Sequence, residues 1–123
     1  ELDEIFAVID QIGERGANVR RYFNREEKNA YALPPIGEQY FIETDDFGIR
    51  LYCVVLNEGV VFLLNGDRKK TLKATEPGSN VSRFFFMANS LHNELMNDKL
   101  QHIIEWNEKE IFFDEDYLIN VQG

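Results

Sequence analysis

The feature that most constrains the fold is a pair of β-rich segments in the middle of the chain, residues 48–57 and 60–65. β-Branched and aromatic residues dominate both segments and favour extended backbone. The turn-forming residues Asn57, Glu58 and Gly59 fall at their junction. Two extended segments joined by so short a turn pair as an antiparallel hairpin. We therefore expect a β-hairpin at the centre of the fold.

Two helical segments are predicted before this hairpin. Apolar residues recur at steps of three and four from Leu2 to Ile12, which predicts an amphipathic helix over residues 2–13 that Gly13 and Gly16 end. A second helical stretch is predicted from Ala17 to about Lys28. The short turn between the two predicts a helical hairpin at the N-terminal end.

The remaining segments complete a mixed pattern of helices and strands. Leu33, Pro34 and Pro35 stop any helix, and a strand is expected at about 38–44. Helical spacing over residues 79–107 predicts one long helix, or two joined near Asn97, with Ser79 or Asn80 as the N-cap. One or two short closing strands are expected over 111–121. The prediction is a single α+β domain over residues 1–123, with an antiparallel sheet.

Composition limits the compartment and the chemistry. A chain of 123 residues with 44% hydrophobic content can bury a core without a metal or a disulfide. Cys53 is the only cysteine and lies in an apolar run, which indicates a buried thiol and leaves no partner for an intrachain disulfide. No apolar run approaches the roughly 20 residues of a membrane span. We expect a cytoplasmic protein without cofactor and without a membrane partner.

The charge is strongly acidic and unevenly distributed. Thirteen Lys and Arg residues against 22 Asp and Glu residues give a net charge of -9, which repels nucleic acid over the molecule as a whole. Residues 1–73 carry ten of the thirteen basic side chains and thirteen of the acidic ones. The first part of the chain could therefore carry a local basic face on an acidic body.

The candidate site residues lie on and after the predicted hairpin. Alternation along the strand points Arg50 and Tyr52 to the same side. The densest basic cluster follows the hairpin and consists of Arg68, Lys69, Lys70 and Lys73. Together with Arg50, such a cluster could hold the phosphates of an RNA backbone. The alternatives are an arginine that is paired or faces a sheet edge, and an ordinary solvated turn.

No metal site is predicted. His92 and His102 lie ten residues apart and show no ligand spacing with another His or Cys. The acidic run Asp114, Glu115 and Asp116 lacks the spaced ligands and glycine of a calcium loop. These side chains are expected to be solvated or at the edge of the core.

The order of elements and the segment FGIRLYCVVLNEGVVFLLNGDRKKT resemble the RelE/ParE superfamily of toxin-antitoxin ribonucleases, notably its HigB-type and phage-derived members, over about residues 2–75. The resemblance implies a RelE-like fold and metal-independent cleavage of mRNA at the ribosome, with an antitoxin as partner. It implies that Arg50, Lys69 and Lys70 hold the phosphate and that Tyr52 or Tyr117 orients or deprotonates the nucleophile. Arg68 and Lys73 would add contacts to RNA.

Two departures from that family support an alternative function. The chain is acidic where such ribonucleases are basic, and segment 79–107 is longer than the family's late helix. The consecutive residues Phe84, Phe85, Phe86 and Met87 cannot all face one core from a single helix. The alternative is therefore a non-catalytic acidic domain that binds a protein partner or self-associates through segment 84–87.

Overall fold

The computed structural model describes residues 2–35, 48–70 and 79–119 of the chain and shows a mixed α+β architecture, as expected. Its helices and strands follow one another along the chain as α1 (Leu2–Arg15), α2 (Val19–Tyr22), β1 (Glu26–Glu27), β2 (Ala30–Leu33), β3 (Gly48–Asn57), β4 (Val60–Lys69), α3 (Ser82–Leu100), β5 (Glu105–Trp106) and β6 (Ile111–Phe112).

The main sheet is antiparallel, with the strand order β1-β2-β3-β4. The predicted central hairpin is confirmed as β3 and β4, but β4 continues to Lys69 and does not end at residue 65. It continues because Gly66 fits where a larger residue would not: a Cβ there would lie 1.7 Å from the carbonyl oxygen of Arg50. A register shift near this point lets Leu51 pair with Gly66 and Cys53 pair with Leu63.

The N-terminal helical prediction is right for the first helix and wrong for most of the second. Helix α1 runs through Gly13 to Arg15, and the chain turns at Gly16 with a φ of +90°. The expected helix over 17–28 is only four residues long, because the following residues enter the sheet. Glu27 pairs with Ala30, and the amide of Ala32 donates to the carbonyl of Arg25 at 3.1 Å. Strand pairing has overridden the local helical pattern.

Strand β2 was not predicted, since the short segment AYAL carries little strand signal of its own. It pairs with the middle of β3, with Tyr31 opposite Cys53 and Leu33 opposite Leu51. The expected strand at 38–44 lies outside the described residues. The sheet therefore gains, on the side of β3 away from β4, a strand that the sequence pattern did not indicate.

The long helical segment forms one helix and not two, and it ends at Leu100. Trp106, which had been placed in this helix, belongs to β5 and pairs with Ile111 of β6. The N-cap residue is Val81, although the Oγ of Ser79 accepts a hydrogen bond from its amide at 3.3 Å. Of the expected closing strands, the described residues contain β6 and no strand after it.

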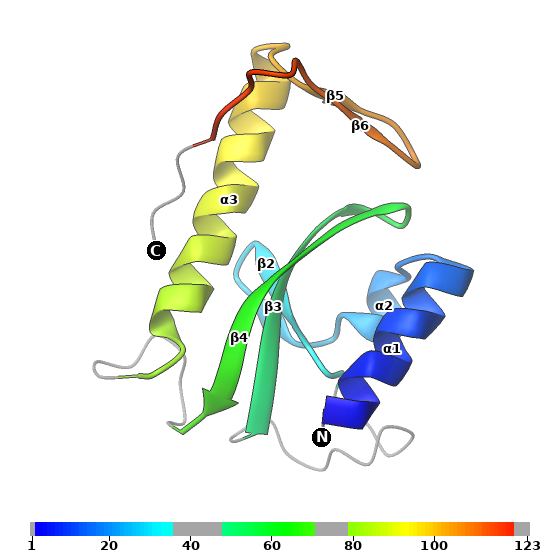
Figure 1. The fold of residues 1–123 in the computed structure, drawn as a ribbon, viewed down its shortest axis with the longest axis vertical. Helices are drawn as coiled ribbons and strands as arrows, with labels where there is room; N and C mark the ends of the chain where they lie inside the picture. Colours follow the sequence, from blue (N-terminus) through cyan, green and yellow to red (C-terminus); the bar gives the residue numbers. More distant parts are fainter. Residues whose placement is uncertain (1, 36–47, 71–78, 120–123) are drawn as a thin grey trace.

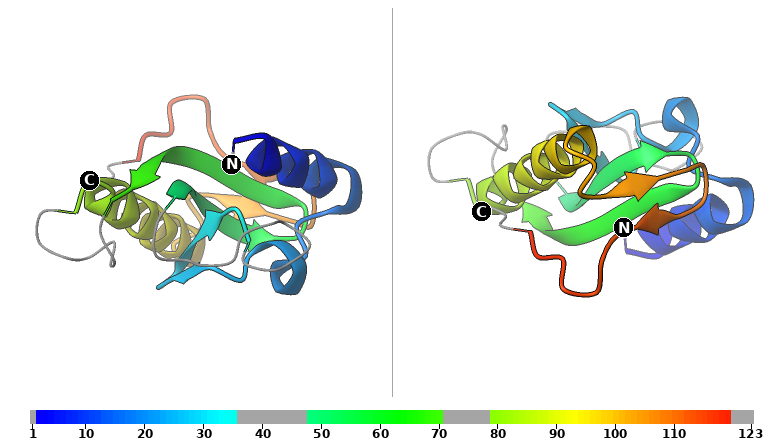
Figure 2. Two further views of the ribbon diagram at one scale, coloured as in Figure 1. Left: turned by 90° about the horizontal axis from the view of Figure 1, so that it is seen from below. Right: turned by 90° about the horizontal axis from the view of Figure 1, so that it is seen from above.

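The sheet lies between α3 on one face and α1 with α2 on the other (Figures 1 and 2). Each face carries its own core. Buried residues on the α3 side are Ala30, Ala32, Tyr52, Val54, Val81, Phe84, Phe85, Ala88, Leu91, Leu95 and Ile104. Those on the other side are Val8, Ala17, Tyr22, Phe23, Leu33 and Cys53.

The β5–β6 pair bends from the end of α3 towards the tip of the β3–β4 hairpin (Figure 1). The side-chain amide of Asn57 donates to the carbonyl of Asn107 at 2.7 Å. A Cβ on Gly59 would lie 1.7 Å from the carbonyl oxygen of Glu108, so the two backbones meet without room for a side chain. This contact, which we call the tip contact, closes the α3 side of the fold at its far end.

Candidate functional site

The predicted pairing of Arg50 with Tyr52 on one side of β3 is consistent with the packing, because Tyr52 and Val54 face the α3 core whereas Leu51 and Cys53 face the α1 core. These side chains are buried, whereas the side chains of an open RNA groove would be exposed to solvent. Arg50 is 2% exposed and Tyr52 is 0% exposed. The Nη1 of Arg50 donates to the carbonyl of Ile49 at 3.1 Å. Arg50 is therefore built into the protein interior.

The cations after the hairpin divide into one buried and two exposed side chains. Lys69 pairs in register with Gly48 and is 8% exposed, whereas Arg68 and Lys70 are exposed. Asn80 fixes the backbone here: its Nδ2 donates to the carbonyl of Arg68 at 2.5 Å, and its Oδ1 accepts from the amide of Lys70 at 3.0 Å. Lys73 lies outside the described residues.

Arg25 is a member of the buried cluster that the sequence did not single out. It is 5% exposed, and its Nε donates to the carbonyl of Pro34 at 2.6 Å. The positive charges of Arg25 and Arg50 both act on the Tyr52 hydroxyl, as does the negative charge of Glu27. In the sequence, Arg25 is only one basic residue of a segment that was predicted to be a helix. We call the buried cations Arg25, Arg50 and Lys69 the buried basic cluster; two of them, Arg25 and Arg50, act on the Tyr52 hydroxyl.

Tyr52 is not set up as a base in this arrangement. Burial removes the phenolate from water and raises the pKa of the Tyr52 hydroxyl above its ordinary value, and Glu27 raises it further, against a smaller opposing effect of Arg50 and Arg25. Within the part of the chain that the structure describes, this hydroxyl has no hydrogen-bond partner. The hydroxyl is therefore neutral at physiological pH.

Tyr117 lies at the opposite end of α3 from the basic cluster. Its hydroxyl donates to Oδ2 of Asp98, and burial, this hydrogen bond and the negative charge of Asp98 raise the pKa of Tyr117 to about 12. Asp98 is 16 residues beyond Ser82, about 24 Å along a helix axis. The N-terminal end of α3 lies beside β4, because Asn80, just before the helix, is hydrogen-bonded to the backbone of Arg68 and Lys70. Arg50 and Lys69 are thus brought together, and Tyr117 is not brought to them.

The other titratable candidates take structural places. Cys53 is fully buried, and burial raises the pKa of its thiol to about 12. The Nδ1 of His102 lies 3.0 Å from Oε1 of Glu105 on the surface. Among the described residues, no three His, Cys, Asp or Glu side chains are grouped as metal ligands.

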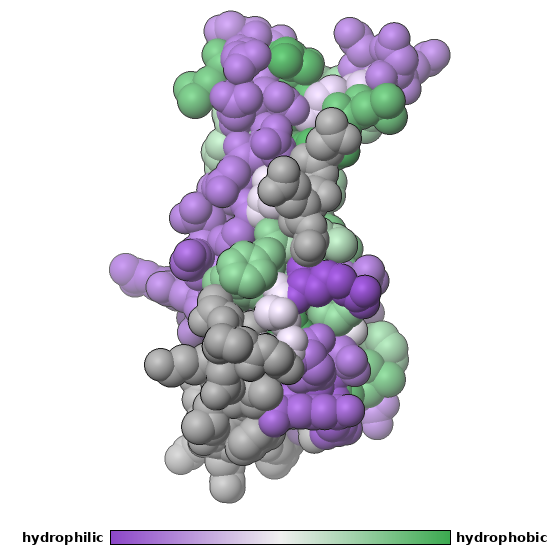
Figure 3. Space-filling view, turned by 90° about the vertical axis from the view of Figure 1, so that its left-hand side faces the viewer, coloured by the Kyte–Doolittle hydropathy of each residue, from purple (hydrophilic) through white to green (hydrophobic). Residues whose placement is uncertain are grey.

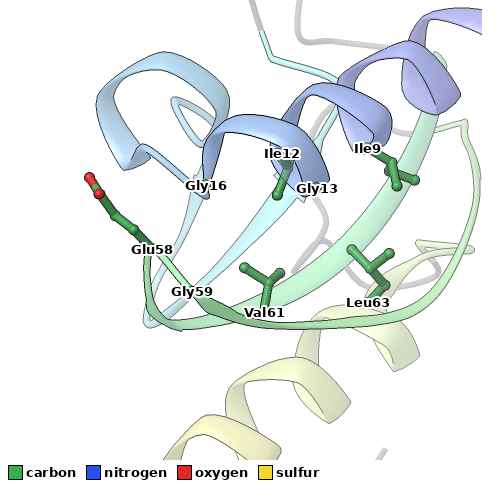
Figure 4. A pocket seen from close by; sticks show the side chains of 8 residues that line it. All are labelled: Ile9, Ile12, Gly13, Gly16, Glu58, Gly59, Val61 and Leu63. Atoms are coloured by element: carbon green, nitrogen blue, oxygen red, sulfur yellow. The ribbon is translucent and has the colours of Figure 1, made fainter. Parts of the chain in front are cut away.

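A second candidate site, which the sequence did not indicate, is a groove between α1 and β4. It consists of two adjoining hollows of about 420 and 330 Å³ that share Ile9. Ile9 and Ile12 point from α1 towards β4, and Val61 and Leu63 point from β4 towards α1 (Figure 4). The remaining lining residues are Leu2, Ile5, Phe6, Gly13, Gly16, Ile49, Arg50, Leu51, Glu58, Gly59, Gly66, Asp67 and Arg68.

The groove exposes large apolar side chains. A further hollow of about 430 Å³ lies at the C-terminal end of α3 and is lined by Met96, Lys99, Leu100, His102 and Glu105. Leu2 is 49% exposed, Phe6 55% and Leu63 46%. Hydrophilic side chains cover most of the outer surface of α3 (Figure 3). In the predicted self-association segment, Phe84 and Phe85 are buried and only Phe86, at 48%, is markedly exposed. The α1–β4 groove is therefore an apolar hollow on the α1 side of the sheet.

No protein-family model, curated protein or solved structure matches this chain. None of the described helices combines the length and the apolar character that crossing a membrane requires.

Proposed function

We propose that this chain is a non-catalytic protein-interaction domain on a RelE-like α+β scaffold. The observation that carries the proposal is the apolar groove between α1 and β4, where Leu2, Phe6 and Leu63 expose about half of their surface. Exposed apolar hollows of this kind mark binding surfaces in soluble domains. The charge of -9 favours a protein partner over a nucleic acid.

The RelE-like part of the proposal is supported by the order of elements. A helix and a helical turn precede the strands, the hairpin with the segment LLNGDRKK follows, and a later helix packs across the sheet. The groove side of this scaffold is formed by α1 and β4, and both elements lie within the part of the chain that resembles those toxins.

A second candidate function is a metal-independent mRNA endonuclease toxin that an antitoxin neutralises. The specific observation in its favour is that the charges of Arg25 and Arg50 both act on Tyr52, with the buried Lys69 on the neighbouring strand, paired with Gly48. Cleavage would require the α3 face to open, because Arg50 and Tyr52 are almost fully covered. Arg68 and Lys70 are the exposed cations that could contact RNA first.

Induced expression separates the two functions. The wild type is compared with an Arg68→Ala, Lys70→Ala variant, which removes exposed cations and leaves the buried cluster in place. Growth and total mRNA are followed over time, and circular dichroism of both purified proteins checks the fold. Normal growth with intact mRNA is the expected result. Growth arrest with mRNA loss that the variant abolishes would replace our proposal by the toxin.

A further inference from the structure

We propose that the α1–β4 groove binds an extended segment of a partner protein in which apolar residues alternate with Lys or Arg, and that this segment adds a strand to the edge of β4. The inference rests on the proposed function and names the class of partner. Three properties of the groove carry it: an edge strand, an apolar floor and an acidic rim.

The first property is the edge. Strand β4 pairs with β3 on one side and, among the described residues, with no strand on the other. Such an edge presents backbone donors and acceptors to an incoming strand. Asn80 already occupies the edge at Arg68 and Lys70, so its side-chain amide ends the stretch that can accept a partner. The open stretch is residues 60–67, which is enough for a strand of ordinary length.

The second property is the apolar floor beside this edge. Val61 and Leu63 are two residues apart, and they point to the same side of β4, towards α1 (Figure 4). Ile9 and Ile12 stand opposite them on α1. Every second side chain of an added strand would enter the space between the helix and the sheet. The groove therefore selects apolar residues at alternate positions.

The third property is the acidic rim. Glu58 and Asp67 are exposed and line the groove. Helix α1, which forms one wall, carries three further exposed acidic residues, Asp3, Asp10 and Glu14. Asp3, Asp10 and Glu14 are seven and four residues apart, which places them in one row on α1 next to Phe6. The exposed bases of α1 and β4 are Arg15 and Arg68. Five acids against two bases favour Lys or Arg at the intervening positions of the partner.

The test uses the whole chain and a synthetic peptide in which Val and Lys alternate over about nine residues. We expect saturable binding, measured by fluorescence anisotropy, and protection of amides within 60–67 from hydrogen exchange. A peptide of the same length that alternates Val with Glu is the control for charge. Equal binding of the two peptides would overturn the acidic selection.

Two matched variants localise the site. Leu63→Lys places a cation on the apolar floor and should weaken binding by at least about tenfold. Phe86→Lys adds the same charge at a position of similar exposure on α3, 48% against 46%, and should leave binding unchanged. Absence of saturable binding, or equal affinity in both variants, would overturn the proposal.

The outcome remains separate from that of the expression experiment. Growth arrest with mRNA loss would reject the non-catalytic function and leave a measured peptide complex at β4 intact. Intact mRNA together with no peptide binding would reject the groove as the docking surface and leave protein binding through another surface as the function.

Discussion

The two faces of the sheet are covered to different extents. Helix α3 buries Phe84, Phe85, Ala88, Leu91 and Leu95 against one face, whereas the buried residues of α1 on the other face are Ile5 and Val8. Both helices have apolar residues at helical spacing, so the difference is not one of pattern. It arises because the side of α1 that carries Leu2, Phe6 and Ile9 faces the edge of β4 and does not lie over the sheet. An amphipathic helix can therefore pack against a sheet and still leave part of its apolar stripe exposed.

The largest expected effect compares one phenylalanine from each helix. Phe85→Ala should lower the free energy of unfolding by about 3–5 kcal/mol, because Phe85 is 3% exposed and its removal leaves a cavity. Phe6→Ala should change it by no more than about 0.5 kcal/mol, since Phe6 is 55% exposed. Urea unfolding of both variants measures this. Equal losses would mean that α1 packs as tightly as α3.

Asn89 tests whether the α3 face also depends on polar contacts. Its Oδ1 accepts from the amide of Asn29 at 2.8 Å, and its Nδ2 donates to the carbonyls of Glu27 at 2.9 Å and Phe85 at 3.0 Å. Asn89→Leu should cost about 1–3 kcal/mol of unfolding free energy, because the groups at Asn29 and Glu27 lose their partner.

Thermal and urea unfolding of Asn89→Leu are compared with those of Asn93→Ala, which removes an exposed contact to the Asn29 side chain at 3.3 Å. A loss no greater in Asn89→Leu than in this control would show that water replaces the buried contacts.

Cys53 should make the free energy of unfolding depend on pH in the alkaline range. Its thiol pKa is raised from 9.0 to about 12 by burial, so between these values the unfolded thiol is ionised while the folded one stays neutral. The free energy of unfolding is fully retained below pH 9 and falls above it. This fall amounts to up to about 1.4 kcal/mol per pH unit, and the Cys53→Ala variant should lack it. Urea titrations from pH 7 to 11 measure it, and parallel curves for both proteins would contradict the assignment.

Tyr52→Phe should have the smallest effect. The Tyr52 hydroxyl is fully buried and has no hydrogen-bond partner among the described residues, so its removal leaves no group unsatisfied. We expect the free energy of unfolding to stay the same or to rise by up to about 1 kcal/mol. A marked loss in calorimetry would reveal that the hydroxyl holds the basic cluster together.

The parts of the fold that could be predicted are those whose pattern is contained in one segment. The β3–β4 hairpin combines β-forming residues with an adjacent turn, and α1 and most of α3 repeat apolar residues at helical spacing. Strand β2 could not be predicted, because AYAL becomes a strand by pairing with β3. For the same reason the segment after Tyr22, helical in its spacing, enters the sheet.

The candidate sites show the same limit. Alternation along β3 predicted a common side for Arg50 and Tyr52, and Tyr52 does lie in the α3 core. The burial of Tyr52 depends on α3, which lies about 30 residues further along the chain. Arg25 joins them through the fold alone, and the groove exists only where α1 comes to lie beside β4. Sequence periodicity predicts the side to which a residue points, and distant segments decide what covers that side.

The tip contact has a consequence for the order of events during synthesis. Gly59 and Asn57 cannot meet Glu108 and Asn107 until about 50 further residues have been added. At 5–20 residues per second, the hairpin tip waits roughly 2–10 s for its partner. During that interval the α3 side of the sheet lacks Ile104 and Trp106, so the nascent chain displays an apolar surface that the finished protein hides. This is the period in which a chaperone would have most to recognise.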